Sequence, residues 1–364
     1  MMTIQKVNIF IILMLLKFGA IAQVLPTPES YLCYQANQPI EIDGALDEAD
    51  WAKAEWTELF LDIEGDQMTK PKFDTKVKML WDDQYLYIAA EMIEPHLWST
   101  ITERDAVIYL DNDFEVFINP LQDSPIYYEF EVNLLNTVWD MMMPKPYRDG
   151  GRNMNSWHIE GLKSATKMFG TINDPSDIDE KWTVEIAFPL SVLSQERPDL
   201  IYPVEGRRWR INFSRVEWQH EIVEGKYTKK INPETKKAYP EYNWVWSPQG
   251  AINMHMPEQW GYLEFTKNKV GDKKNTDVSE SESERLYRQL FDVYRAQRAF
   301  KHKNKKYAKS MKELKFTDKF MYNNKEVKPY IQNIPHGYYV VLEIPQEDLT
   351  LMVRHDSNGE IIKK

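Results

Sequence analysis

Residues 77–90 read VKMLWDDQYLYIAA, two apolar runs joined by a short polar turn. The turn composition Asp82-Asp83-Gln84 favours a hairpin between two strands. Similar β-branched and aromatic runs recur at 114–118, 128–133, 182–187 and 209–213, and their alternation places one face of each strand in a core. No long segment of helical period separates the runs, which disfavours crossover helices. We therefore expect an all-β fold, an antiparallel β-sandwich, over residues 31–267.

The composition excludes several classes of protein. The 364 residues are 43% hydrophobic and carry 45 basic against 56 acidic side chains, a net charge of −11. The apolar share excludes wholesale disorder, and the negative charge argues against a nucleic-acid partner, because binding phosphates requires a surplus of Lys and Arg. Cys33 is the only cysteine, so an internal disulfide and a cysteine-based zinc site are both excluded.

Residues 1–22 have the pattern of a secretory signal peptide. Lys6 precedes an apolar run at 9–16, and small residues at Ala20 and Ala22 stand before Gln23. The apolar run is about half of the ~20 residues that span a bilayer. We expect cleavage near Ala22/Gln23, no stable membrane span afterwards, and a secreted or periplasmic protein.

The composition changes after residue 267. Residues 268–283 are almost entirely polar, which predicts a linker. Residues 284–364 then show a helical apolar pattern followed by short strands, which predicts a small α+β domain. This region is faintly similar to the helix-to-head junction of type IV pilin-like proteins. Its basic helix could dock on an acidic polysaccharide, an anionic lipid surface or the acidic body itself, or could simply pack on its own sheet.

Six stretches together resemble the family 9 carbohydrate-binding modules. They are IDGALDEADW (42–51), LWDDQYLYI (80–88), NDFEVFI (112–118), YEFEVN (128–133), WTVEIAFP (182–189) and PEQWGYL (257–263). The resemblance covers about residues 31–267 and implies a β-sandwich that binds an oligo- or polysaccharide without cleaving it. Proteins of this kind act beside polysaccharide-degrading enzymes.

The resemblance also implies particular binding residues. Tyr109 falls where the first of two stacking aromatic rings should lie, Glu115 matches a conserved sugar-binding Glu of the family, and Asn133 matches a polar partner on the next strand. Two positions depart from the family pattern. Glu131 stands where the family has Arg, and Met254 stands where the second stacking Trp should be.

The residue chemistry suggests further candidates independently. Sugar rings pack their C–H faces on aromatic planes, while their hydroxyls need polar partners. The dense polar and aromatic run at 215–220 predicts an exposed rim, with Arg215, Glu217 and Trp218 as sugar ligands. Trp246 and His255 are further candidates near the end of the body, whereas Trp81, Trp182 and Trp209 are expected in the core.

Other chemistries receive less support. Asp111, Asn112 and Asp113 could begin a structural calcium site, which the family also carries. The seven His show no HExxH spacing and the chain has no GxSxG motif, so no catalytic residue is assigned and no cofactor is required.

The expected function is a secreted or periplasmic carbohydrate-binding protein that holds a glycan for degradation by other enzymes. Two alternatives stay open. One is a glycoside hydrolase, because 56 acidic side chains provide many carboxylate pairs. The other is a cell-envelope interaction module that has lost its sugar site, as the residues Glu131 and Met254 would allow.

Overall fold

The structure is a computed structural model that describes residues 25–122, 125–195, 197–272, 276–317 and 319–363. The expected signal peptide at 1–22 lies outside the described residues. Among the helices that are described, none combines the length and the apolar character needed to cross a membrane.

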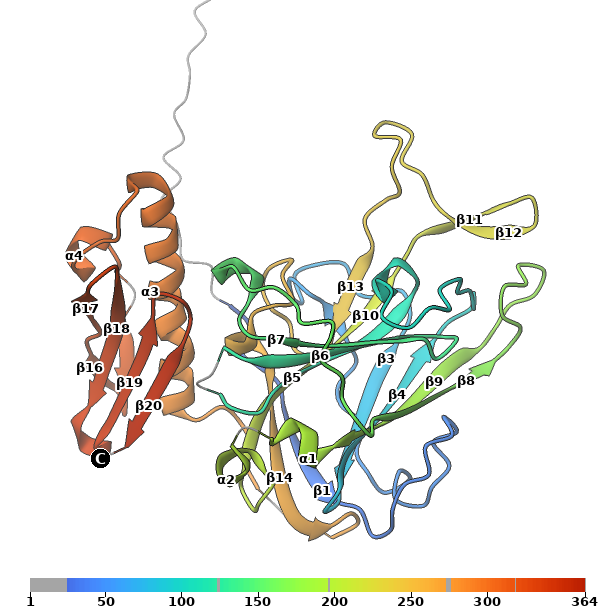
Figure 1. Cartoon of the computed structure of the whole chain (residues 1–364), viewed down its shortest axis with the longest axis horizontal. Helices are drawn as coiled ribbons and strands as arrows, with labels where there is room; N and C mark the ends of the chain where they lie inside the picture. The colour runs from blue at the N-terminus through green and yellow to red at the C-terminus, as the bar shows by residue number, and fades with distance from the viewer. Residues whose placement is uncertain (1–24, 123–124, 196, 273–275, 318, 364) are drawn as a thin grey trace, which may run out of the picture.

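One curled sheet of twelve strands forms the body (Figure 1). Most of it follows the order β7-β6-β5-β10-β14-β1-β3-β4-β9-β8, and β13 pairs with both β10 and β2. Its strands are β1 (Ser30–Gln35), β2 (Leu61–Asp62), β3 (Thr75–Trp81), β4 (Tyr85–Ile93), β5 (Asp113–Asn119), β6 (Tyr127–Asn133), β7 (Val138–Met143), β8 (Lys163–Phe169), β9 (Lys181–Pro189), β10 (Arg208–Glu217), β13 (Tyr242–Val245) and β14 (Gly261–Lys269). A separate hairpin joins β11 (His220–Val223) to β12 (Lys226–Lys229).

The fold is mainly β, as expected, but the all-antiparallel sandwich is wrong. β1 runs parallel to both of its neighbours, β14 and β3, and the strands form one continuous mixed sheet. Alternation in a sequence indicates which face of a strand is buried, but not the direction of its neighbour. The predicted hairpin at β3 and β4 is confirmed, with Trp81 opposite Leu86.

The two faces of the sheet differ in chemistry. Phe114, Val116 and Ile118 of β5 enter the main apolar core, and Trp81, Trp182 and Trp209 are buried there as expected. The intervening β5 residues Asp113, Glu115 and Phe117 therefore project from the opposite face. Short helices connect the strands: η1 (Ile108–Leu110), η2 (Tyr147–Asp149), α1 (Leu190–Leu193), α2 (Pro198–Ile201) and η3 (Pro257–Gln259).

The segment at 42–51 is held against the sheet by one carboxylate. Glu185 of β9 accepts hydrogen bonds from the backbone N–H of Asp43 (3.0 Å) and Gly44 (2.8 Å) and from the Trp51 indole (2.7 Å). Gly44 has a positive φ of 84°, and a Cβ there would lie 2.8 Å from the backbone carbon of Thr166. Only glycine fits this position without strain.

The C-terminal part has its own core and its own sheets. The helix α3 (Glu282–Asn304) begins with a capping box at Ser281 and Glu284. It packs on a four-stranded sheet of β17, β18, β19 and β20. The elements after α3 are α4 (Met311–Leu314), β15 (Phe320–Tyr322), β16 (Lys325–Val327), β17 (Tyr330–Ile334), β18 (Gly337–Ile344), η4 (Pro345–Glu347), β19 (Leu349–Arg354) and β20 (Gly359–Lys363).

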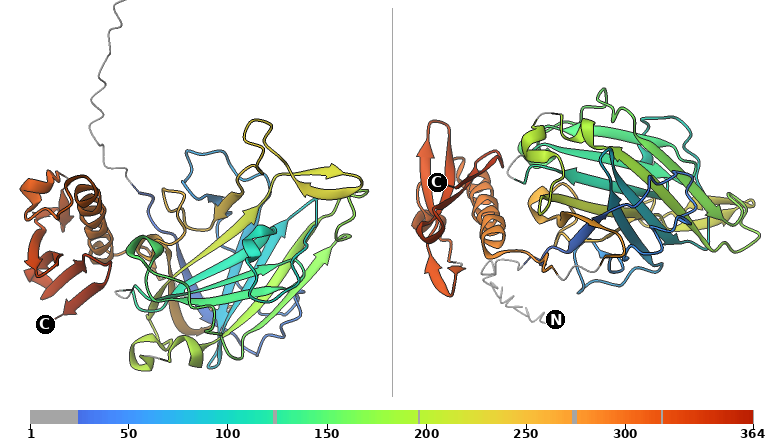
Figure 2. Two further views of the ribbon diagram at one scale, coloured as in Figure 1. Left: turned by 45° about the horizontal axis from the view of Figure 1, so that its top comes forward. Right: turned by 90° about the horizontal axis from the view of Figure 1, so that it is seen from below.

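The helix α3 lies between the small sheet and the body in both views of Figure 2. Its arginines face acidic groups: Arg295 pairs with Glu258 (3.0 Å), Arg298 with Asp149 (2.9 Å) and Arg288 with Glu280 (2.8 Å). Two of the alternatives for this helix therefore hold together, because it packs on its own sheet and its arginines also contact the acidic body. Glu280 lies within the expected linker, yet its buried carboxylate makes that stretch part of the interface.

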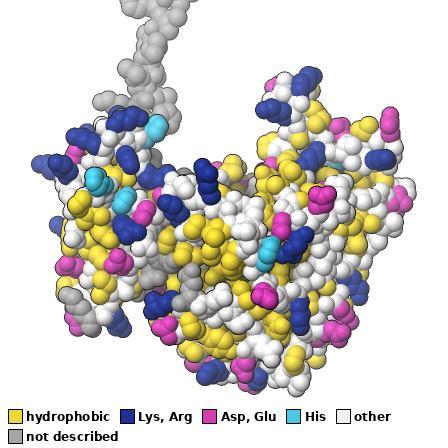
Figure 3. Space-filling view, in the orientation of Figure 1, with side chains coloured by type: hydrophobic (Ala, Val, Ile, Leu, Met, Phe, Trp, Pro, Cys, Tyr) yellow, Lys and Arg dark blue, Asp and Glu magenta, His cyan; other side chains and the backbone are white. Residues whose placement is uncertain are grey.

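Other basic side chains of this region stay exposed. Lys301, Lys303, Lys305, Lys306 and Lys309 lie at or beyond the C-terminal end of α3. In the space-filling view, Lys and Arg side chains gather at the upper end of the C-terminal part (Figure 3).

Gly44→Ala tests the contact between the 42–51 segment and the sheet. We expect it to lower the free energy of unfolding by about 3 kcal/mol, because left-handed backbone strain and a backbone collision add together. The matched control is Gly206→Ala, where φ is +75° but nothing lies within 4 Å of the added Cβ, so about 1 kcal/mol is expected. Urea denaturation of both variants measures the difference, and equal losses would contradict the close approach.

Glu258→Ala tests the interface with the C-terminal part. Glu258 accepts from Arg148 (2.8 Å) and Arg295 (3.0 Å), and its side chain is 2% exposed. Its removal leaves the buried Arg148 guanidinium without its best partner, so we expect a loss of about 3 kcal/mol in the free energy of unfolding. Glu326→Ala breaks only exposed pairs at 3.9 and 4.0 Å and should cost less than about 0.5 kcal/mol. Calorimetric unfolding compares them, and equally small losses would show that the interface does not depend on Glu258.

Candidate functional site

A cavity of about 500 Å³ opens above β5, β6 and β7 on the face of the sheet that points away from the main core. We call it the acidic pocket. It is lined by Ile63, Val107, Tyr109, Glu115, Phe117, Glu129, Glu131, Trp139, Tyr147, Val216, Glu241, Asn243, Ile252, Asn253, Met254 and His255.

Strand alternation brings carboxylates onto the floor of the acidic pocket. Glu115 of β5 and Glu131 of β6 stand directly opposite each other in the ladder, and Glu129 follows on the same face of β6. All three side chains are buried. Like charges directly opposite each other in a sheet are unfavourable, so this floor is an unusual arrangement for a purely structural sheet.

Burial raises the pKa of every carboxyl in this group. The pKa of Glu115 rises to about 7, mainly because its charged form loses solvation. Desolvation and then the charge of Glu115 raise the pKa of Glu129 and of Glu131 well above the ordinary value. The floor therefore favours a bound group that donates hydrogen bonds or carries positive charge.

Aromatic and apolar side chains form the mouth of the acidic pocket. Tyr109, in η1, and Tyr147, at the start of η2, are 39% and 45% exposed. The backbone N–H of Tyr109 donates to Glu131 Oε2 at 3.1 Å, which ties the ring's position to the floor. Exposed rings beside a polar floor are the combination that a sugar requires.

His255 lies beside Tyr147 and Tyr127. Its ring contacts the edge of the Tyr147 ring at 4.5 Å between centroids, and its Nδ1 lies 2.6 Å from the Tyr127 hydroxyl. Burial, and then the nearby Arg148 guanidinium, lower the pKa of His255 to about 4. His255 is therefore a neutral polar group at neutral pH.

The structure brings part of the predicted site together. Tyr109, Glu115 and His255 line the acidic pocket, and so do Glu131 and Met254, the two positions that depart from the family pattern. The other candidate sugar ligands, Asn133, Arg215, Glu217, Trp218 and Trp246, do not line this pocket.

Asn133 is fully buried and has a structural role. Its Nδ2 donates to the Ile101 carbonyl (2.8 Å) and to Asp111 (3.1 Å), and its Oδ1 accepts from the backbone of Leu135 and Thr137. This set uses the hydrogen-bonding capacity of the amide. The expectation that Asn133 contacts a sugar is therefore corrected.

Arg215 and Glu217 lie inside the protein rather than on an exposed rim. Arg215 is 1% exposed and donates to Glu94 (2.7 Å) and Glu217 (3.0 Å). Its remaining donors bind Thr75 and the Ile93 carbonyl. The expected rim is wrong because Arg215 continues the buried face of β10 after Ile211 and Phe213.

The two tryptophans are also buried. The Trp218 indole donates to the Tyr109 carbonyl at 2.8 Å, and Lys229 lies 3.3 Å over its ring. Trp218 thus positions Tyr109 without reaching the pocket. Trp246 belongs to the main core and packs on Phe213, so its assignment as a sugar ligand is corrected.

The predicted calcium loop does not form one ligand set. Asp111 accepts from Ser99, Thr100, Ile101 and Asn133. The Asn112 side chain donates a hydrogen bond to Glu217 and accepts one from the Trp218 backbone N–H. Of the three, only Asp113 has a carboxylate without a hydrogen-bond partner, whereas Asp111 and Asn112 already bind groups of the protein itself.

Several pocket residues were not assigned as ligands from the sequence. Glu129 and Glu131 lie in the recognised stretch YEFEVN, whose alternation with Phe130 and Val132 already places both carboxylates on one face. Glu241 and Asn243 follow a turn-rich stretch in which no pattern indicates their position.

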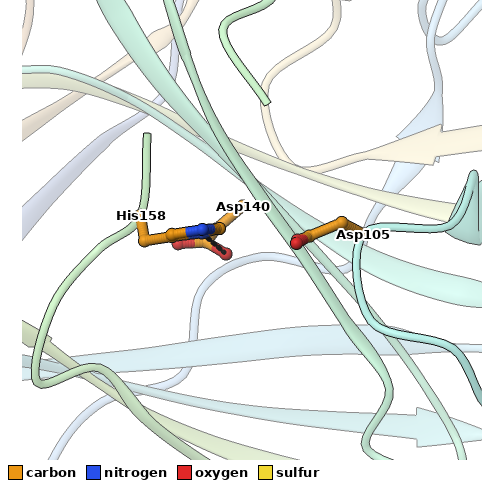
Figure 4. Close-up of side chains that lie close together, drawn as sticks. All are labelled: Asp105, Asp140 and His158. Carbon is orange, nitrogen blue, oxygen red and sulfur yellow. Dashed lines mark ion pairs between the residues drawn. The ribbon is translucent and has the colours of Figure 1, made fainter. Parts of the chain in front are cut away.

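A second group of possible metal ligands comprises Asp105, Asp140 and His158 (Figure 4). The Nδ1 of His158 lies 3.7 Å from Asp140, while Asp105 approaches from the other side. The Arg104 guanidinium pairs with both aspartates, and the Ile159 N–H donates to Asp140 at 2.5 Å. The positive charge at this place is already supplied by Arg104.

Solved structures that match the chain include a Bacteroides uniformis protein provisionally described as carbohydrate-binding, with 16% identity, coverage of 65% of this chain and 99% of that chain, and a TM-score of 0.47. A family 9 carbohydrate-binding module from Caldicellulosiruptor kristjanssonii matches in complex with cellotriose and with glucose, at 16% and 17% identity. Each of these matches covers 68% of this chain and 100% of the module, with a TM-score of 0.41. None of the curated proteins matches the chain.

The family comparison gives a match to residues 42–201 under the description "Carbohydrate family 9 binding domain-like". This range begins at the segment held by Glu185 and contains Tyr109, Glu115, Glu131 and Tyr147 of the acidic pocket. Residues 42–201 are therefore a carbohydrate family 9 binding domain-like region of the chain.

Proposed function

We propose that this chain is a secreted or periplasmic carbohydrate-binding protein and that the acidic pocket is its glycan site. In this role it holds an oligo- or polysaccharide for degradation by other enzymes and does not cleave it. The single observation that supports this site best is the pairing of two exposed rings, Tyr109 and Tyr147, with a floor of buried carboxylates.

The proposed site suits sugar chemistry in two ways. The C–H face of a sugar ring would pack on Tyr109 or Tyr147. Its hydroxyls would donate to Glu115, Glu129 or Glu131, which accept hydrogen bonds when ionised. Asn243 and Asn253, which also line the pocket, can both donate and accept.

The pocket would differ from the family pattern at the two departing positions. Glu131 adds negative charge where the family has a cationic donor, and Met254 supplies an apolar wall in place of a stacking ring. Tyr147 contacts the His255 ring in the same pocket and would serve as the second aromatic surface. A neutral glycan fits this pocket better than an acidic one.

Alanine substitution of the two exposed tyrosines tests the site. We expect Tyr109→Ala and Tyr147→Ala each to weaken glycan binding about tenfold or more, because each removes an aromatic surface that a ring can cover. A glycan array that includes cellotriose and glucose finds the ligand, and calorimetry measures its Kd. The matched control is Tyr330→Ala, which removes a tyrosine of similar exposure (43%) from the small C-terminal sheet.

Three results would contradict this function. Unchanged Kd values in both variants would exclude the acidic pocket as the glycan site. Release of reducing sugar by the wild-type protein, lost in Glu115→Gln, would move it to the glycoside hydrolases. Absence of any glycan ligand, with co-purification of an envelope protein, would favour an interaction module.

The location of the protein is tested by expressing the full chain in a bacterial host. We expect the mature protein in the periplasm or the medium, with Gln23 as its first residue, because the sequence before Gln23 has the signal-peptide pattern. Intact mass spectrometry of the purified protein identifies the first residue. Full-length protein retained in the cytoplasm would contradict export, and the same chain lacking residues 2–22 is the control.

A further inference from the structure

Two carboxylates of the pocket floor lie close to a third buried carboxylate, that of Asp113. Asp113, Glu115 and Glu131 each offer one oxygen, and these oxygens all lie within 4.8 Å of one another. The side chains come from two adjacent strands, β5 and β6. They are 1%, 6% and 2% exposed, so the group differs from an ordinary exposed acidic patch.

Asp113 provides an independent sign that a ligand is missing. Both of its carboxylate oxygens are buried and have no hydrogen-bond partner within normal geometry. The Val216 amide lowers the pKa of Asp113, but burial and the charges of Glu115 and Glu131 raise it by more. A buried polar side chain without a partner is rare and needs a specific explanation, and binding of an ion or water is a common one.

Within the described part of the chain, no lysine or arginine neutralises this group. The groups that lower the three pKa values are the Val216 amide at Asp113, the Ser214 side chain at Glu115, and the amides of Tyr109 and Ile108 at Glu131. The buried Arg148 guanidinium, next in the chain to the pocket residue Tyr147, pairs with Glu258 and Asp149 instead. The described residues therefore supply no cationic side chain that balances the ionised forms of Asp113, Glu115 and Glu131.

We propose that Asp113, Glu115 and Glu131 bind a calcium ion at the floor of the acidic pocket. Three carboxylates supply hard oxygen ligands, which Ca²⁺ prefers over the nitrogen and sulfur ligands of zinc. With Ca²⁺–oxygen distances of about 2.4 Å, ligands on opposite sides of the ion are up to about 4.8 Å apart. Mg²⁺ demands stricter octahedral geometry and usually keeps several waters with only one or two protein carboxylates, so a group of three protein carboxylates favours Ca²⁺.

The pocket gives the ion a route and further ligands. Glu115 and Glu131 line the cavity of about 500 Å³, so water can reach the ion and complete the six to eight oxygens that Ca²⁺ takes. This site shares only Asp113 with the loop expected from the sequence. Its other ligands come from the cross-strand pair Glu115 and Glu131, which adjacent positions in a loop do not indicate.

Calcium titration of the full mature chain, freed of metal with a chelator, tests the proposal. We expect one Ca²⁺ per chain by calorimetry and a rise of at least about 3 °C in the Tm at saturating Ca²⁺. Asp113→Asn and Glu131→Gln should each weaken Ca²⁺ binding at least tenfold. Glu221→Gln, on the exposed hairpin of β11 and β12, is the matched control and should bind Ca²⁺ like the wild type.

The metal-free variants separate a ligand role from a folding defect. Each substitution keeps the side-chain shape and removes one buried like charge, so the metal-free variants should be at least as stable as the wild type. The same substitutions should abolish the rise in Tm with Ca²⁺. Absence of Ca²⁺ binding by the wild type, unchanged affinity in both variants, or tighter binding of Mg²⁺ than of Ca²⁺ would each overturn the proposal.

A second experiment, on glycan binding, rests on the proposed function. If the ion lies where sugar hydroxyls bind, chelation should weaken glycan binding, because the ion can accept hydroxyl oxygens as ligands. Ca²⁺ binding without any glycan ligand would overturn the proposed function alone. Glycan binding without Ca²⁺ binding would overturn the metal site alone.

Discussion

The repulsion between Glu115 and Glu131, opposite each other on β5 and β6, is the constraint around which this domain is arranged. With Asp113 and Glu129 beside them, two strands bury four carboxylates on one face of the sheet. The free energy of unfolding of a domain is small, so a cluster of this kind persists only where other interactions offset it. The opposite face of the same strands supplies that offset, because Phe114, Val116 and Ile118 enter the main apolar core.

Alternation in the sequence was enough to predict most strands, the β3–β4 hairpin and the buried tryptophans. The parallel pairing of β1 could not be predicted, because it depends on contacts with β14 across more than two hundred residues of chain. At the site, three of the predicted sugar ligands, Tyr109, Glu115 and His255, line one cavity. Arg215 could be predicted only in part. Its spacing from Phe213 indicates that it lies on the core face of its strand, but its buried partner Glu94 can be identified only from the fold.

The two departures from the family pattern act together on the chemistry of the pocket. An arginine at position 131 would balance the ionised carboxylate opposite it, whereas Glu131 adds a second carboxylate whose pKa is raised by burial and by the charge of Glu115. Met254 lines the pocket with an apolar side chain where the family has a ring, while the Tyr147 ring lines the same pocket and contacts His255. The floor of the pocket therefore suits hydrogen-bond donors or cations better than acidic groups.

The C-terminal part bears on the same pocket through a chain of charged contacts. Arg295 of α3 binds Glu258, Glu258 binds Arg148, and Arg148 donates to the His255 carbonyl at 3.4 Å. Arg148 also follows Tyr147 in η2. Arg148 thus links the His255 backbone, and the chain next to Tyr147, to the interface with α3 through Glu258. The basic helix therefore has a structural reason to dock on the acidic body: it supports the wall that presents Tyr147 and His255.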